Sequence, residues 1–265
     1  MNRLTRTYLS SKDTKTHVRC WSSLLDERPT LICFPPVPYT GIFFDTFAKQ
    51  MECEVLCPDL PGYGQSDFLS SDPTIENYVE RLNVCLNQAD EPPKYLLGFH
   101  SGALVAVEMA LKYPDLVAGL ILIDVPLFSE DQRITLKTTL TTPPDYANNR
   151  EKLSQLWETQ VLERMGVIPY ERALDLYLDF ISAGERVNHG FHAATSYVGE
   201  KKFSQLTHPT KIIATNSSLR DGTLRAAGLV SGGLLEELPE ITAPAFELGA
   251  KSIAKITAQF MQRAS

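Results

Sequence analysis

The most constraining feature of the sequence is a short segment in which an apolar run passes directly into a helical pattern. Tyr95–Leu97 is compact and apolar, as a buried strand is, and Gly98 and Gly102 flank the turn that follows it. Small residues at such positions let a strand and a helix approach each other closely. His100, midway between the two glycines, is therefore expected on a strained bend, exposed at the carboxyl edge of a sheet.

Similar apolar runs alternate with helical patterns along most of the chain. Buried parallel strands are predicted at Leu31–Phe34, Val55–Cys57, Tyr95–Leu97, Leu120–Ile123 and Ile212–Ala214. Helices are predicted at Thr74–Ala89, at Ser101–Lys112 and between Leu248 and Phe260. Leu4–Leu9 and Thr16–Trp21 alternate in polarity and predict an antiparallel edge hairpin. The order of elements indicates the α/β class, with a mostly parallel, doubly wound sheet and helices on both faces.

One region interrupts this alternation, because residues 128–206 contain no convincing buried strand. Leu153, Leu156, Trp157 and Val161 have helical spacing. We predict a helical cap at 128–206, inserted into a core formed by residues 1–127 and 207–265. A ligand pocket is expected between the cap and the carboxyl edge of the sheet. Trp157, Phe191 and His192 are predicted to line it and to favour an apolar ligand.

Composition and charge exclude several classes of protein. Hydrophobic residues make up 43% of the chain and charged residues 22%, which is ordinary for a soluble globular protein. A net charge of −7 argues against binding to nucleic acid or to anionic lipid. Five cysteines, an odd number partly inside apolar runs, favour buried reduced thiols. With no signal-peptide core near residue 1 and no run long enough to span a bilayer, we expect a cytoplasmic protein.

Four segments together resemble the α/β-hydrolase superfamily over nearly the whole chain. They are Leu31–Pro38 (LICFPPVP), Pro58–Asp67 (PDLPGYGQSD), Gly98–Gly102 (GFHSG) and Leu116–Asp124 (LVAGLILID). Their order and spacing match the first core strand and its loop, the loop after the next strand, the nucleophile elbow and the strand that leads into a cap. The elbow is most similar to a subset that carries Gly-Tyr-His-Thr-Gly. The resemblance implies the same fold and makes a hydrolase the first expectation for function.

The departures from this family concern the catalytic triad. Position 100 is histidine, where the family carries Ser, Asp or Cys. The usual catalytic histidine follows the last strand, but Leu238–Glu247 contains none, and Thr242 or Ala243 stands in its place. The usual acid follows the strand that ends near Ala214, and the nearest carboxylate is Asp221. A Ser-His-Asp acyl-enzyme mechanism cannot be written with these residues.

The resemblance also implies an oxyanion hole and an alternative position for the catalytic acid. It implies an oxyanion hole made by the backbone N–H groups of Ser101 and Val37, although a shift of one residue would place Pro36 there, which has no N–H. Asp124 resembles the acid position of dehalogenases in the superfamily. Its carboxylate could fix the tautomer of His100, or it could cap the turn after its strand.

These residues leave several functions open. The leading hypothesis is an atypical hydrolase in which His100 is a general base acting on a small apolar ester, lactone or ketone. The alternatives are a non-catalytic protein that binds a small ligand, and a lyase, isomerase or cyclase on the same scaffold. Ser101 is a displaced nucleophile or, more simply, a residue that bonds backbone at a helix start. No cofactor is expected, and the oligomeric state stays open.

The remaining histidines suggest no metal site. His189 and His192 are three residues apart, but no carboxylate follows at ligand spacing, so pocket lining or solvent exposure is expected rather than zinc. His17 and His208 are interpreted as surface residues.

Overall fold

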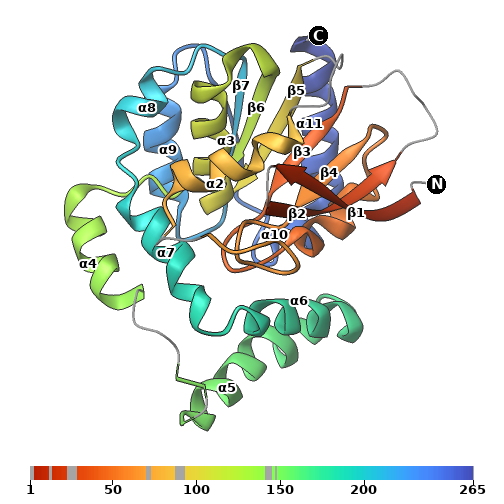
Figure 1. The fold of residues 1–265 in the computed structure, drawn as a ribbon, viewed down its shortest axis with the longest axis vertical. Helices are drawn as coiled ribbons and strands as arrows, with labels where there is room; N and C mark the ends of the chain where they lie inside the picture. Colours follow the sequence, from red (N-terminus) through yellow and green to blue (C-terminus); the bar gives the residue numbers. More distant parts are fainter. Residues whose placement is uncertain are drawn as a thin grey trace.

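The protein is built around one eight-stranded sheet (Figure 1). Its structure, a computed structural model, describes residues 3–11, 14–22, 29–69, 73–86, 93–140, 145–146 and 148–264. The strands are β1 (Arg3–Ser11), β2 (Thr14–Ser22), β3 (Leu31–Phe34), β4 (Val55–Pro58), β5 (Lys94–Phe99), β6 (Val117–Ile123), β7 (Thr210–Thr215) and β8 (Leu234–Leu238). They lie in the order β1-β2-β4-β3-β5-β6-β7-β8. Strands β3 to β8 pair in parallel, whereas β1 with β2 and β2 with β4 are antiparallel.

Helices cover both faces of the sheet, so the parallel strands are buried on both sides. The core helices are α1 (Asp45–Ala48), α2 (Ile75–Leu82), α3 (Ser101–Lys112), α9 (Arg220–Leu229), α10 (Ala245–Leu248) and α11 (Ala250–Ala264). Along β3, Ile32 and Phe34 join the apolar cluster that packs on α2 and α3. Leu31 and Cys33 point the other way, into the cluster with α1, α10 and α11. The fully apolar strands therefore supply two cores, one on each face.

The structure confirms the predicted fold class and most of the predicted elements. All five predicted parallel strands and the edge hairpin are present, and the helix predicted at Ser101–Lys112 has those bounds. α2 begins at a capping box between Thr74 and Asn77 and ends at Leu82, before a 3₁₀ turn at Asn83–Cys85. The rest of the predicted helix, from residue 87, lies outside the described residues.

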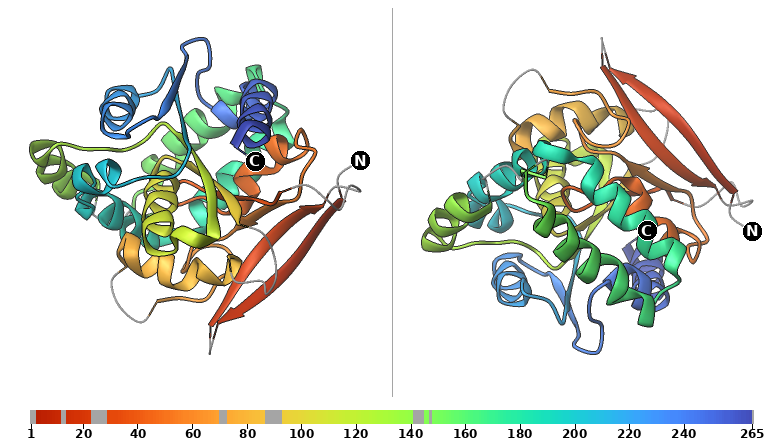
Figure 2. Two further views of the ribbon diagram at one scale, coloured as in Figure 1. Left: turned by 90° about the horizontal axis from the view of Figure 1, so that it is seen from above. Right: turned by 90° about the horizontal axis from the view of Figure 1, so that it is seen from below.

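Between β6 and β7 the described residues form helices and no strand. They are α4 (Glu130–Leu140), α5 (Arg150–Trp157), a π-helical turn (Glu158–Leu162), 3₁₀ turns at Arg164–Gly166 and Gly184–Arg186, α6 (Tyr170–Ser182), α7 (Val187–Ser196) and α8 (Glu200–Ser204). Seen from below, α5 and α6 lie across the molecule, while the β1–β2 hairpin stands at one side (Figure 2). None of the helices in the described ranges has both the length and the apolar character needed to cross a bilayer.

Side-chain contacts attach α6 to the loop that follows β3. The Asp179 carboxylate accepts hydrogen bonds from the backbone N–H and the hydroxyl of Thr40, both at 2.8 Å. Arg172 donates to the carbonyl oxygens of Ile42 and Phe43 and pairs with Glu247. These contacts place α6 beside the carboxyl edge of the sheet.

A second attachment joins α7 to the loop after β4. The Tyr63 hydroxyl donates to the Arg186 carbonyl at 2.8 Å and accepts from the Gly190 N–H at 2.9 Å. Together with α6, this helix lies against the same edge of the sheet, next to the loops that follow β3 and β4.

Candidate functional site

His100 forms the whole connection between β5 and α3, because the strand ends at Phe99 and the helix begins at Ser101. Its backbone has φ 51° and ψ −124°, a conformation that non-glycine residues rarely adopt. A Cβ atom at Gly98 would lie 2.3 Å from the Gly102 carbonyl oxygen, and one at Gly102 would lie 2.0 Å from the Phe34 carbonyl oxygen. The sharp strand-to-helix elbow predicted from the sequence is thus present, and it requires both glycines.

The imidazole of His100 lies in a desolvated environment. The side chain is half-buried, and its ring stacks on Phe99 with the ring centroids 4.0 Å apart. Desolvation lowers the pKa of His100 to about 4, because burial penalises the charged imidazolium. The imidazole is therefore neutral at physiological pH. Within the described part of the chain, neither of its ring nitrogens has a hydrogen-bond partner.

The Asp124 carboxylate accepts from Thr215, and the hydrogen bond that the His100 ring could have donated to it is not formed. One carboxylate oxygen accepts from the Thr215 N–H at 2.8 Å and the other from the Thr215 hydroxyl at 2.6 Å. Burial raises the pKa of Asp124, and the bonds from Thr215 act in the opposite direction. Asp124 has φ 48° and immediately follows β6. These contacts join the end of β6 to the end of β7, and they are made to neither His100 nor the turn that follows Asp124.

Ser101 and Val37 lie together, in the register that the resemblance favours. The Val37 N–H donates a 2.8 Å hydrogen bond to the Ser101 hydroxyl oxygen. Ser101 is the first residue of α3 and is only 5% exposed. Its own N–H comes before the first possible intrahelical bond and so remains an available donor. Of the two N–H groups expected in an oxyanion hole, that of Val37 is already bonded to Ser101, and that of Ser101 has no partner among the residues that the structure describes.

The remaining triad positions hold no catalytic pair. The loop after β8 presents Thr242 and Ala243, both exposed, where the family has its histidine. Asp221 lies in the first turn of α9, and its side chain is exposed. Asn216 and Ser217, rather than a carboxylate, follow β7.

The residues predicted to bind substrate are distributed along the helical segment. Trp157 is half-buried and its ring packs edge-on against Tyr177 at 5.3 Å. Phe191 is half-buried and packs on the core cluster that contains Val37 and Tyr63. His192, like His189, is exposed on α7. Among the described residues, no group of three or more His, Cys, Asp or Glu side chains is arranged to hold a metal ion.

The interpretation of His17 as a surface residue is wrong. His17 is 5% exposed and its Nδ1 lies 2.8 Å from the Asp59 carboxylate, which also accepts from the Gly41 N–H. The alternation of the hairpin strand gave no signal of this, because Thr16 to Arg19 are all buried instead of alternating between buried and exposed.

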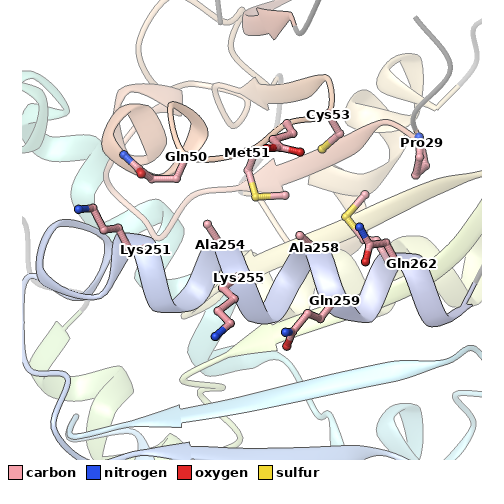
Figure 3. Close-up of a pocket in the computed structure, with 12 residues that line it drawn as sticks. Pro29, Gln50, Met51, Cys53, Lys251, Ala254, Lys255, Ala258, Gln259 and Gln262 are labelled. Atoms are coloured by element: carbon pink, nitrogen blue, oxygen red, sulfur yellow. The ribbon is translucent and has the colours of Figure 1, made fainter. Parts of the chain in front are cut away.

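Two cavities lined by described residues lie away from the elbow. The larger, of about 690 Å³, lies between α11 and the chain just before β4. Figure 3 shows Ala254 and Ala258 of α11 facing Met51 across it. A second, of about 320 Å³, lies beside the starts of β7 and β8. Both are at the amino edge of the sheet, whereas His100 follows the carboxyl end of β5.

Comparison with known proteins decides the fold. Residues 37–161 match the model of the alpha/beta hydrolase fold family. Over 97% of its length the chain is similar to the enol-lactonase from Burkholderia xenovorans LB400, with a TM-score of 0.79 at 14% identity and coverage of 100% of that chain. The protein has the α/β-hydrolase fold. A hydrolase from Pseudomonas aeruginosa PA01 gives a TM-score of 0.78 at 17% identity, covering 98% of both chains.

Relatives of this α/β-hydrolase-fold protein are also found by sequence. It is 30% identical to Lipase LipV of Mycobacterium tuberculosis over 101 residues, 38% of each chain. It is 33% identical to the pimeloyl-[acyl-carrier protein] methyl ester esterase of Shewanella woodyi over 84 residues, 32% of this chain. The chain spans only 38% and 30% of the lengths of these two relatives. The α/β-hydrolase fold, predicted from four segments, is confirmed.

Proposed function

We propose that this protein is an atypical hydrolase in which His100 acts as a general base on a small apolar carbonyl compound. The observation that carries the proposal is the neutral imidazole held at the elbow with φ 51°. A strained conformation persists only where its surroundings enforce it, and such strain gathers at functional sites. The neutral imidazole is the form that accepts a proton, and its pKa of about 4 makes it a weaker base than an imidazole exposed to water.

The proposed reaction needs no covalent bond to the enzyme. His100 removes a proton from a water molecule as the water oxygen bonds to the carbonyl carbon, and the carbonyl π electrons move onto its oxygen. When the tetrahedral intermediate collapses, the bond to the leaving oxygen breaks and that oxygen takes the proton from the imidazolium. General-base catalysis of this kind contributes about 10²–10⁴-fold in rate. The Ser101 N–H is the donor available to the developing oxyanion.

The ligand class follows from the side chains near the elbow. Phe99 stacks on His100, and half-buried Phe191 packs on the same cluster as Val37. An apolar molecule with one carbonyl group therefore fits better than a charged one. Two of the sequence relatives are named as a lipase and a methyl ester esterase. These names support beginning the search for substrates with short-chain esters and lactones.

The experiment is turnover of a panel of p-nitrophenyl esters, lactones and ketones by wild type and by His100→Ala. We expect a loss of about 10²-fold or more in kcat for His100→Ala. His189→Ala is the matched control, because His189 is exposed on α7 and should leave the rate unchanged. A fluorophosphonate probe should leave Ser101 unmodified. A rate unchanged by His100→Ala, or a stoichiometric adduct on Ser101, would contradict the proposal.

A second candidate is a non-catalytic protein that binds the same class of ligand. Two observations favour it: the Val37 N–H is bonded to Ser101, and Asp124 is bonded to Thr215 rather than to His100. Binding of a small apolar carbonyl compound without turnover across the panel would support this function. His100→Ala would then change only the affinity.

A further inference from the structure

The bond between Val37 and Ser101 has a consequence for any ligand oxygen at the elbow. The Val37 nitrogen is 2.8 Å from the Ser101 hydroxyl oxygen. The hydroxyl oxygen therefore takes the position in which a ligand oxyanion would accept a hydrogen bond from the Val37 N–H. We propose that Ser101 is a positioning residue whose hydroxyl withholds the Val37 N–H from the ligand until its side chain rotates away. This inference rests on the proposed function only in placing the ligand's carbonyl oxygen beside Val37 and Ser101.

The Val37 loop itself cannot shift to release its N–H. A Cβ atom at Gly190 on α7 would lie 2.4 Å from Val37 Cγ1, so α7 is pressed directly against the Val37 side chain. At the other end of the loop, a Cβ at Gly102 would lie 2.0 Å from the Phe34 carbonyl oxygen. Val37 is also only 7% exposed. The loop is thus enclosed between α7 and the start of α3.

The Ser101 side chain is the part that can move. The proposed movement is a χ1 rotation between staggered positions, which takes the hydroxyl away from Val37 while the backbone stays in place. Among the described residues, the Ser101 hydroxyl accepts from Val37 and donates to no partner, so rotation breaks one protein hydrogen bond. In the resting state the site offers one donor, the Ser101 N–H; after rotation it offers two. Ligands that carry a strong oxyanion are the ones able to drive the change.

The test uses n-butylboronic acid, whose hydrated tetrahedral anion mimics the intermediate formed by attack of water. Its dissociation constant is measured for wild type, Ser101→Ala and Ser101→Thr. Ser101→Ala leaves the Val37 N–H free, and we expect it to bind at least about 10-fold more tightly, since one oxyanion donor is typically worth about 10²–10³-fold. Ser101→Thr keeps the hydroxyl and should bind like wild type. Ser101→Gly, which also lacks the hydroxyl, repeats the test if the alanine variant folds poorly.

A second readout does not depend on catalysis. In protein labelled with ¹⁵N-valine, the Val37 amide resonance should move in Ser101→Ala, and should move further when n-butylboronic acid binds to either form. Weaker or unchanged binding by Ser101→Ala would overturn the inference, because the hydroxyl would then contact the ligand itself or play no part. Failure of the proposed function is seen separately, as a rate that His100→Ala does not alter.

Discussion

The carboxylate of Asp124 is bound at both oxygens by one residue, Thr215, through its N–H at 2.8 Å and its hydroxyl at 2.6 Å. Thr215 is the last residue of β7, and Asp124 immediately follows the neighbouring parallel strand, β6. Just before Asp124, the Ile123 carbonyl accepts from the His100 N–H at 3.1 Å. The backbone of the elbow is therefore held by the end of β6, which Asp124 in turn joins to β7, and the imidazole of His100 is left without a carboxylate partner.

Asp124→Ala should destabilise the fold through this pair. The Thr215 N–H is left buried without an acceptor, which costs about 1–3 kcal/mol. Alanine at φ 48° adds roughly 1–2 kcal/mol of backbone strain. Asp124→Asn keeps an acceptor and tolerates positive φ, so we expect a loss below about 1 kcal/mol. Asp124→Gly relieves the backbone strain but does not restore the acceptor, so its loss of unfolding free energy should lie between those of the Asn and Ala variants. Urea unfolding measures all three, and equal losses for Asn and Ala would contradict the role assigned to Thr215.

The two glycines of the elbow should not accept a side chain. Gly102→Ala places a Cβ 2.0 Å from the Phe34 carbonyl oxygen, so we expect a loss of about 3 kcal/mol or more, or failure to fold. Gly228→Ala is the matched control, because nothing lies within 4 Å of its Cβ position in α9. That variant should gain about 0.5–1 kcal/mol, as a helical Gly→Ala change does. Thermal unfolding of both variants gives the comparison.

His100 should make stability depend on pH below neutrality. Its pKa falls from 6.5 to about 4 on folding, so the unfolded chain binds a proton first as the pH falls. The stability that this histidine contributes is present above pH 6.5 and is lost as the pH falls towards 4. His100→Asn, which tolerates positive φ, should flatten the urea midpoint over this window. His189→Asn, at an exposed position, should leave the pH dependence of the urea midpoint as in wild type. If the midpoints of wild type and His100→Asn change in parallel with pH, the lowered pKa of His100 is disproved.

Asp179 should act with the opposite sign. Burial raises its pKa from 3.8 to about 6, despite the two bonds from Thr40. The native state holds this proton more firmly than the unfolded chain, so the contribution is favourable below pH 3.8 and is lost as the pH rises through 6. Asp179→Asn should therefore gain in stability relative to wild type between pH 4 and 7. Asp175→Asn, exposed one turn earlier on α6, is the control that should show no such trend.

The elbow could be predicted from sequence because its determinants are local. An apolar strand, two glycines and an apolar helix occupy Tyr95–Lys112 without interruption. The contacts that decide the chemistry are not local: Val37 and Ser101 are 64 residues apart, and Asp124 and Thr215 are 91 apart. Which partner each polar group chooses depends on side-chain rotation in the packed fold, and no periodicity encodes it.

Two further differences have similar causes. β8 was not predicted because it is an edge strand with Leu234 and Leu235 exposed, so it lacks the apolar character of a strand covered on both faces. His17 was predicted at the surface because a strand pattern does not reveal that the loop after β4 folds over it and supplies Asp59.

Arg172 fixes α6 to the core through the Ile42 and Phe43 carbonyls and through Glu247. No described residue of α4 or α5 is buried; α4 is held by the Arg133–Glu200 ion pair, and α5 by the packing of half-buried Trp157 on Tyr177. We therefore expect α4 and α5 to unfold locally at a smaller cost in free energy than α6 and α7. A protease added to the native protein should cut first within α4 or α5, leaving α6, α7 and the elbow intact, and that order of cleavage shows which half of the segment gives way when a molecule enters or leaves.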